Sequence, residues 1–107
     1  MTPHTMTHAA QITIARETFI ATGGADENGS IPGTVELTLF GETRVVVASL
    51  STKYNWIFAR GIEGHYRTGT KWWSGTVQST TDGKINVQFG RYDNHPKFNK
   101  TNVRFKN

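Results

Sequence analysis

The chain has 107 residues, of which 36% are hydrophobic and 19% charged, with a formal net charge of +4 and no cysteine. This length fits one domain, and the missing cysteines exclude disulfide bonds, thiolate metal ligands and thiol catalysis. The longest apolar run, residues 45–50, is far shorter than the roughly 20 residues that a membrane helix needs, and no secretory leader is visible at the start, so we expect a soluble, cytoplasmic protein.

Short strands separated by polar turns are predicted along the chain from residue 11 onwards. Residues 1–10 show no periodicity and are expected to form a disordered tail before a single domain over residues 11–107. The alternation or β-branched composition of strands occurs in residues 11–21, 34–40, 43–50, 54–60, 71–78, 84–91 and 102–106. Turns are expected between these runs, among them residues 23–33, residues 61–69 and a hairpin turn at Asp82 and Gly83.

Two details of the pattern refine the predicted fold. In the first run the apolar parity changes between Ile14 and Phe19, which predicts a β-bulge near residues 15–17. The second run alternates regularly from Val35 to Leu39, so its apolar residues share one face. No window keeps the helical spacing of apolar residues. The sequence therefore predicts an all-β domain with a single antiparallel, mostly up-and-down β-barrel, or a closely related sandwich.

The charge of the chain is unevenly distributed. Residues 1–52 carry a net charge of −3, whereas residues 53–107 carry +7. A basic half favours an anionic partner such as nucleic acid, an acidic protein or an anionic small molecule. The alternative is a solvated basic surface that only keeps the protein in solution.

Aromatic and basic residues share a predicted face near the ends of three strands. If this face points into a barrel, rings and cations would meet at one mouth, where rings offer stacking area and cations favour an anionic ligand. The candidate ligand-binding residues are Phe58, Arg60, Lys71, Trp73 and Phe89. The alternative is that the rings are core residues and the two cations reach out at the rim.

Several segments between residues 18 and 89 carry a family resemblance. They are Thr18-Phe19-Ile20-Ala21-Thr22-Gly23-Gly24-Ala25-Asp26, Gly33-Thr34-Val35-Glu36, Thr43-Arg44-Val45-Val46-Val47, Trp73-Ser74-Gly75 and Lys84-Ile85-Asn86-Val87-Gln88-Phe89. In this order they resemble strands of the avidin and streptavidin family. The resemblance implies a ligand-binding, up-and-down barrel, and it is compatible with a homo-oligomer because such barrels assemble through their faces.

The positions that contact biotin in that family differ in this chain. Trp73 matches one family tryptophan. The family's tyrosine, two hydroxyl residues and two further tryptophans are replaced at the positions of Val35, Leu37, Lys71, Arg60 and Phe89. Biotin binding in the family's usual way is therefore not expected, and the two cations suit a different, anionic ligand.

A second set of segments lies within residues 70–106. It consists of Trp73-Ser74-Gly75-Thr76-Val77, Asp82-Gly83-Lys84, Val87-Gln88-Phe89 and Asn102-Val103-Arg104. These segments resemble the C-terminal part of SH3-like and Tudor-like barrels, which implies binding of a peptide or of nucleic acid. The candidate nucleic-acid-binding residues of the basic C-terminal third are Trp72, Lys84, Arg91, Tyr92, Lys97, Lys100, Arg104 and Lys106.

No residue set for catalysis or metal binding can be assembled from the sequence. The four histidines have no acidic partners at ligand spacing, and no nucleophile lies in a motif with a base. We therefore favour a binding protein over an enzyme, although small barrels can assemble a catalytic site across strands. We expect no metal, no cofactor and no membrane partner. The leading hypothesis is a small, planar, anionic ligand in the barrel mouth. The alternatives are nucleic-acid binding and a protein-interaction or inhibitor module with an exposed β-edge.

Overall fold

The computed structural model describes residues 11–65, 71–90, 92–93 and 102–106, and every regular element in these residues is a β-strand. The strands are β1 (Ile12–Ala21), β2 (Ser30–Leu39), β3 (Glu42–Ser51), β4 (Trp56–His65), β5 (Trp72–Ser79), β6 (Ile85–Phe89), β7 (Tyr92–Asp93) and β8 (Asn102–Phe105). The predicted all-β class is confirmed. No helix in this part of the chain could cross a membrane.

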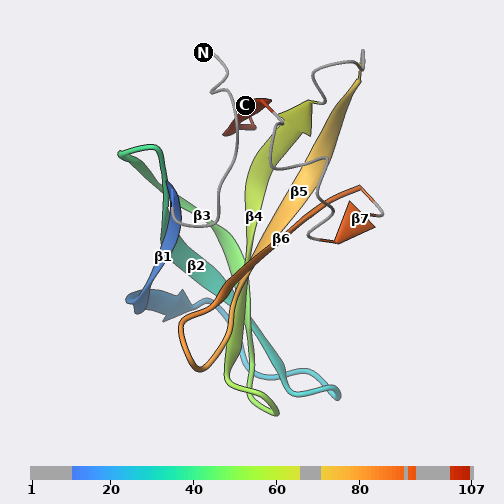
Figure 1. Cartoon of the computed structure of the whole chain (residues 1–107). Coiled ribbons are helices and arrows are strands. Elements are labelled where there is room, and N and C mark those ends of the chain that lie inside the picture. Colours follow the sequence, from blue (N-terminus) through green and yellow to red (C-terminus); the bar gives the residue numbers. More distant parts are fainter. Residues whose placement is uncertain (1–10, 66–70, 91, 94–101, 107) are drawn as a thin grey trace.

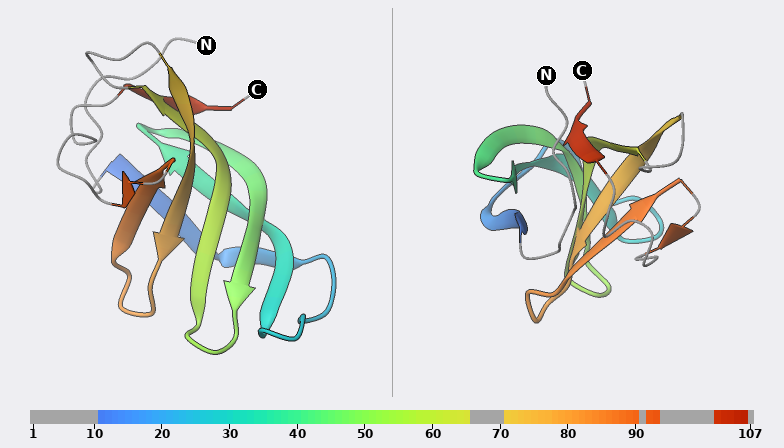
Figure 2. Two further views of the ribbon diagram at one scale, coloured as in Figure 1. Left: turned by 90° about the vertical axis from the view of Figure 1, so that its right-hand side faces the viewer. Right: turned by 45° about the horizontal axis from the view of Figure 1, so that its top comes forward.

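Neighbouring strands in the chain are also neighbours in one antiparallel sheet. Pairing runs in the order β1-β2-β3-β4-β5-β6-β7, and β8 pairs with β4 outside this path. The sheet is strongly twisted and curved, and the turns that follow β1, β3 and β5 lie at the same end, which we call the hairpin end (Figures 1 and 2). The predicted up-and-down order is confirmed, although no ladder among the described residues returns from β6 or β7 to β1.

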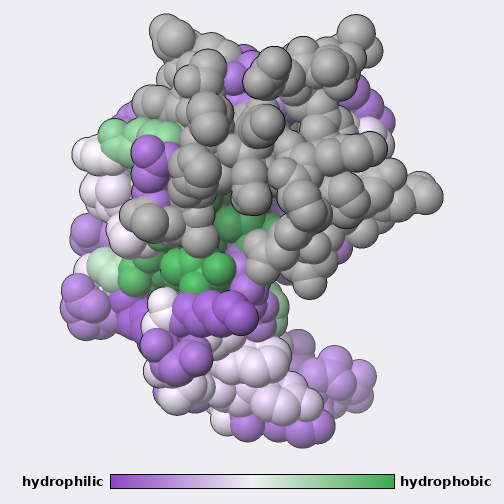
Figure 3. Space-filling view, in the orientation of Figure 1, coloured by the Kyte–Doolittle hydropathy of each residue, from purple (hydrophilic) through white to green (hydrophobic). Residues whose placement is uncertain are grey.

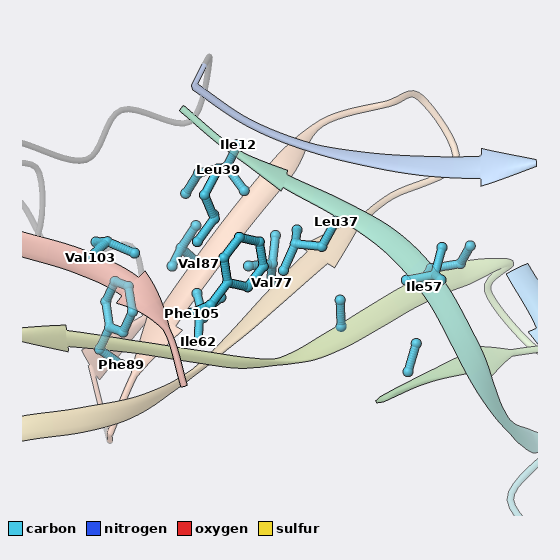
Figure 4. Close-up of a cluster of buried hydrophobic side chains, with 13 residues drawn as sticks. Ile12, Leu37, Leu39, Ile57, Ile62, Val77, Val87, Phe89, Val103 and Phe105 are labelled. Atoms are coloured by element: carbon cyan, nitrogen blue, oxygen red, sulfur yellow. The ribbon is translucent and has the colours of Figure 1, made fainter. Parts of the chain in front are cut away.

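The inner, concave face of the sheet holds the hydrophobic core. The predicted alternation in β2 is confirmed, because Val35, Leu37 and Leu39 are fully buried while Glu36 and Thr38 are only partly covered. The other buried apolar side chains are Ile12, Ala48, Ile57, Ala59, Ile62, Val77, Val87, Phe89, Val103 and Phe105. Figure 4 shows that the cluster extends along the sheet from Ile57 to Phe89 and Val103. In the view of Figure 3, hydrophilic residues cover most of the hairpin end.

The predicted bulge in β1 is confirmed by the strand register. Ala15 pairs with Glu36 and Ile20 pairs with Thr34, so residues 16–19 of β1 lie opposite a single residue of β2. The Thr18 hydroxyl donates to the carbonyl of Ala15 at 2.6 Å and accepts from the amide of Glu36 at 2.9 Å. The hydroxyl thereby satisfies backbone groups that the interrupted ladder leaves without partners.

Arg16, which lies in this bulge, joins β1 to strands that do not pair with it. Its guanidinium donates to the carbonyl of Ser79 at 2.9 Å and to the carbonyl of Asn55 at 2.6 Å. These carbonyls lie at the end of β5 and in the turn before β4. Side-chain hydrogen bonds thus span the curved sheet near its hairpin end, where no backbone ladder connects β1 to β5 among the described residues.

The β5–β6 connection is the predicted hairpin turn. The Gly83 amide donates to the carbonyl of Thr80 at 2.9 Å, and the Thr80 amide donates to the carbonyl of Lys84 at 3.0 Å. Gly83 has a φ of +83°, a left-handed conformation that glycine adopts without steric cost. The Asp82-Gly83 signal in the sequence is therefore confirmed.

Two of the predicted turns are partly strand. In each of them a glycine allows another part of the chain to pack closely and does not form a turn. Strand β2 begins at Ser30, inside the predicted turn 23–33, and a Cβ on Gly33 would clash with the carbonyl oxygen of Ile20. Strand β4 continues to His65, into the predicted turn 61–69, and a Cβ on Gly64 would lie 2.8 Å from the Phe89 ring. A glycine that permits close approach has the same sequence signal as a glycine in a turn.

Strand β8 takes the place beside β4 that β3 leaves. Pairing of β3 with β4 covers Ala48 to Ser51 and stops at the pair formed by Ala48 and Ala59. From Ile62 onwards, β4 pairs with β8, beginning with the pair formed by Ile62 and Phe105. The switch occurs at Gly61, whose φ is +95°, and the register to β5 also shifts there. The first half of β3 therefore diverges from β4.

Candidate binding surface on the outer face of strand β4

The predicted barrel-mouth residues divide between two faces of the sheet. Trp73 pairs with the buried Gly64 and lies on the inner face, where it is half-buried, and the Lys71 ammonium lies 4.4 Å from the centre of its ring. Phe89 also lies on the inner face and is fully buried. Its ring packs so closely on Gly64 and Gly75 that a Cβ on either glycine would lie within 3 Å of it. Phe89 is thus a core residue without an exposed face for a ligand.

Phe58 and Arg60 lie on the opposite, outer face. Their neighbours Ile57 and Ala59 are buried in the core, and side chains alternate along a strand. The expected meeting of Phe58 and Arg60 with Trp73 and Phe89 is therefore wrong. The sequence correctly predicts which residues of each strand share a face. It does not indicate which face of β4 packs on the core, because Ile57 and Ala59 alternate with larger aromatic residues.

The outer face of β4 carries a row of aromatic rings at the hairpin end. Tyr54, in the turn, and Trp56 stack with ring centres 4.7 Å apart and an angle of 22° between their planes. Phe58 follows on the same face as Trp56, and both are partly exposed. Tyr54 is 50% exposed, and the Lys53 ammonium lies 5.3 Å from its ring centre. The rings lie on the face of the sheet opposite the core residues and present flat apolar surface to solvent.

A surface pocket of about 560 Å³ lies beside this row. Its lining residues are Trp56, Gln78, Thr80, Thr81, Asp82, Lys84 and Asn86. The amide of Asn86 donates to the Gln78 side-chain oxygen at 3.3 Å, and the Thr81 hydroxyl donates to the Tyr54 carbonyl at 2.9 Å. The pocket thus combines one indole surface with amides, hydroxyls and a lysine, the polar groups that orient a ligand in small-molecule sites.

The carboxylate of Asp82 belongs to the turn that bounds this pocket. The Thr80 hydroxyl donates to it, and the Lys84 amide donates to the same oxygen at 3.4 Å. The hydrogen bond from Thr80, followed by that from the Lys84 backbone, lowers the pKa of Asp82 below its ordinary value of 3.8. The carboxylate is therefore charged at neutral pH and caps the backbone of the turn.

Basic residues continue the aromatic row along the outer face. Arg60 follows Phe58 and is exposed, and the Lys106 amide donates to the Gly61 carbonyl at 2.7 Å, which places Lys106 beside Arg60. The Lys106 ammonium donates to the Ser74 hydroxyl at 3.0 Å, which is a neutral partner. Arg60 and Lys106 have no carboxylate partner among the described residues.

Arg104 lies further along the same face in an ion pair. Its Nε donates to Glu63 at 2.6 Å, and its guanidinium lies 3.7 Å from the ring centre of Trp72. His65 lies beside the same ring, with ring centres 5.1 Å apart. Arg104 and His65 thus already cover the ring of Trp72. We call the succession of Tyr54, Trp56, Phe58, Arg60, Lys106 and Arg104 the outer track.

The predicted nucleic-acid-binding residues are only partly brought together. Trp72, Arg104 and Lys106 lie at one end of the outer face, whereas Lys84 lies at the hairpin end in the β5–β6 turn. Tyr92 forms part of β7. The remaining candidates, Arg91, Lys97 and Lys100, lie outside the described residues, as does the predicted tail.

Sequence analysis missed the contribution of Trp56, Gln78 and Asn86. The signal was present, since Trp56 shares parity with Phe58 and Arg60, and polar amides at alternate positions mark the outer face of β5 and β6. In the described part of the chain, no three histidine or acidic side chains converge as a metal site would require.

Searches against protein-family models, curated proteins and solved structures each found no match to this chain.

Proposed function

We propose that the protein is a non-catalytic binding protein that holds single-stranded nucleic acid along the outer track. The observation that supports this proposal best is the succession of aromatic and basic side chains on one sheet face. The stacked rings of Tyr54 and Trp56 are followed by the partly exposed Phe58 and then by the cations Arg60 and Lys106. Proteins that bind single strands combine these two elements, with rings that stack on bases and cations that follow the phosphates.

The charge of the molecule favours the same class of partner. The net charge is +4, and the second half of the sequence carries +7. Arg60 and Lys106 have no carboxylate partner among the described residues, whereas Arg104 is held by Glu63. Attraction to phosphate would raise the rate of encounter, and stacking on the rings would then fix the bases.

Unpaired bases suit this surface better than a duplex. Bases in a duplex are already stacked on each other, so their faces are closed to Trp56 and Phe58. The outer track also lies on the outer side of a curved sheet rather than on a protruding helix or ribbon that could enter a major groove. Stacking tolerates every base, so weak sequence preference is expected.

The test is fluorescence anisotropy with a labelled thymidine oligonucleotide of about 12 nucleotides, at about 50 mM salt and above. Trp56→Ala is expected to weaken binding about 5- to 150-fold, the range of one base–aromatic stack of roughly 1–3 kcal/mol. Arg60→Ala is expected to weaken it and to reduce the salt slope by about one.

Two matched variants act as controls for this experiment. Trp72→Phe alters an indole that Arg104 and His65 already cover, and Lys71→Ala removes the same charge from beside the inner-face Trp73. Both should bind with nearly the affinity of the unaltered protein. Equal losses in Trp56→Ala and Trp72→Phe, or no binding at low salt, would refute the proposal.

A second candidate function keeps the earlier expectation of a small, planar, anionic ligand. It is favoured by one observation, the exposed Lys71 whose ammonium lies 4.4 Å from the half-buried Trp73 ring on the inner face. An anionic heterocycle could stack on the indole and pair with the lysine. A thermal-shift screen with biotin and anionic heterocycles tests it, and stabilisation that persists in Lys71→Ala would contradict it.

A further inference from the structure

The pocket beside Trp56 lies across three strands of the outer face. Gln78 of β5 is paired with Phe58 of β4 on one side and with Asn86 of β6 on the other. Trp56 is therefore a diagonal neighbour of Gln78, at a spacing that an aromatic side chain can span. Both residues line the pocket, so a base that stacks on the Trp56 indole brings its edge within reach of the Gln78 amide.

The charge of the pocket suits a neutral group better than a phosphate. Its described lining residues include one cation, Lys84, and one carboxylate, Asp82, which balance each other. Arg60 and Lys106 do not line this pocket and lie further along the outer track. Phosphates are therefore drawn to Arg60 and Lys106, and the pocket is left for a base.

Hydrogen-bond donors predominate among the groups that the pocket offers to a ligand. Asn86 donates to Oε1 of Gln78 at 3.3 Å, which orients the Gln78 amide and turns its Nε2 hydrogens away from Asn86. Lys84 is exposed and adds an ammonium group. The Asp82 carboxylate, in contrast, already accepts from the Thr80 hydroxyl and the Lys84 amide on one oxygen. A base edge that reaches Gln78 and Lys84 therefore has to be an acceptor.

We infer that this pocket selects bases with a carbonyl group at that edge, which are uracil, thymine and guanine, over cytosine and adenine. Gln78 Nε2 and the Lys84 ammonium donate to the carbonyl oxygen. An amino group in the same place would set donor against donor and leave both without a partner. The inference rests on the proposed function, because the base enters the pocket by stacking on Trp56. Stacking tolerates every base, and the pocket adds a modest preference to it.

The experiment compares the binding of labelled deoxyuridine and deoxycytidine oligonucleotides of about 12 nucleotides by fluorescence anisotropy. Their bases differ only in the group at position 4 and in the proton at N3. The deoxyuridine strand should bind about two- to tenfold more tightly, the range of one hydrogen bond. Equal affinities would overturn the inference and leave the proposed function intact. Tighter binding of deoxycytidine would instead assign base recognition to Asp82. No binding of either strand would refute the proposed function and the inference with it.

Gln78→Glu tests the assigned donor, because it replaces the Nε2 group by an acceptor oxygen and keeps a partner for Asn86. The preference for deoxyuridine should vanish or reverse. Gln88→Glu is the matched control, since Gln88 is exposed on the same face of β6 and lies outside the pocket. It adds the same charge and should weaken both strands by the same factor. Because each ratio is measured on one protein, a partly unfolded variant changes both affinities equally. A deoxyuridine preference that survives in Gln78→Glu would overturn the inference.

Discussion

The two faces of β4 illustrate how one strand serves two purposes. Inward, Ile57, Ala59 and Ile62 are buried, and Gly64 lies under the ring of Phe89. Outward, the same strand presents half-exposed rings and Arg60. The side chains on the inner face are smaller and closely packed, whereas the outer face carries the larger side chains. Size and hydrophobicity alone therefore do not tell which side of a strand is core, and the difference predicts that the two faces respond to substitution in different ways.

Phe89→Ala is expected to have the largest effect on stability. The side chain is fully buried among glycines and apolar residues, and removing such a ring lowers the free energy of unfolding by about 3–5 kcal/mol. Urea denaturation followed by tryptophan fluorescence measures the change. A loss below about 1 kcal/mol would mean that Phe89 lies at an open mouth rather than in the core.

Gly75→Ala tests the close packing of the inner face. The added Cβ would lie 2.6 Å from the Phe89 ring and 3.0 Å from Ile62, so the free energy of unfolding should fall by about 1–3 kcal/mol. Gly24→Ala is the matched control, since no atom lies within 4 Å of its added Cβ and the site is exposed. Equal effects of the two substitutions in thermal or urea denaturation would contradict the described packing.

Glu63→Gln tests the outer face, where binding rather than stability should change. The substitution releases Arg104 from its ion pair and removes a negative charge from the outer track. Oligonucleotide affinity at low salt should rise by a few-fold with a steeper salt slope, while the free energy of unfolding changes by less than about 1 kcal/mol. Unchanged affinity in the anisotropy titration would exclude Arg104 from the track.

The smallest expected effect concerns Asp82 at the hairpin end. Hydrogen bonds from Thr80 and the Lys84 backbone lower the pKa of this carboxyl below 3.8. The contribution of the charged carboxylate to the free energy of unfolding is therefore fully present above the ordinary pKa. It is lost as the pH falls from that value through the lowered one. Asp82→Asn should therefore lower stability slightly at neutral pH, where the charged carboxylate is present, and flatten the acid limb so that the two proteins converge in stability well below pH 4. An unchanged acid limb would contradict this role.

The fold was predictable to a large extent because local signals and tertiary structure agree. The alternation of β2, the parity change in β1 and the Asp82-Gly83 turn each specify local backbone geometry. The missed parts depend on contacts distant in sequence. Gly64 and Phe89 meet only after β4, β5 and β6 have paired, so no local pattern distinguishes that glycine from one in a turn. The resemblance to avidin-like barrels stays a prediction.

The candidate site was predictable in its residue types and only partly in its grouping. Aromatic rings and cations do lie together, but on the outer face for Phe58 and Arg60 and on the inner face for Trp73 and Lys71. The placement of Lys106 beside Arg60 depends on β8 replacing β3 along β4. This pairing joins residues that are far apart in the sequence, such as Ile62 and Phe105. Nothing in the order of strands in the sequence indicates it.

The most direct test of the account follows the three tryptophan indole N–H signals of ¹⁵N-labelled protein by NMR during titration with the thymidine oligonucleotide. The three rings report on separate places, with Trp56 in the outer track, Trp72 under Arg104 and Trp73 on the inner face. The account predicts that the Trp56 signal shifts most and that Trp73 changes little. A dominant shift of Trp73, or no shift of any of the three, would contradict it.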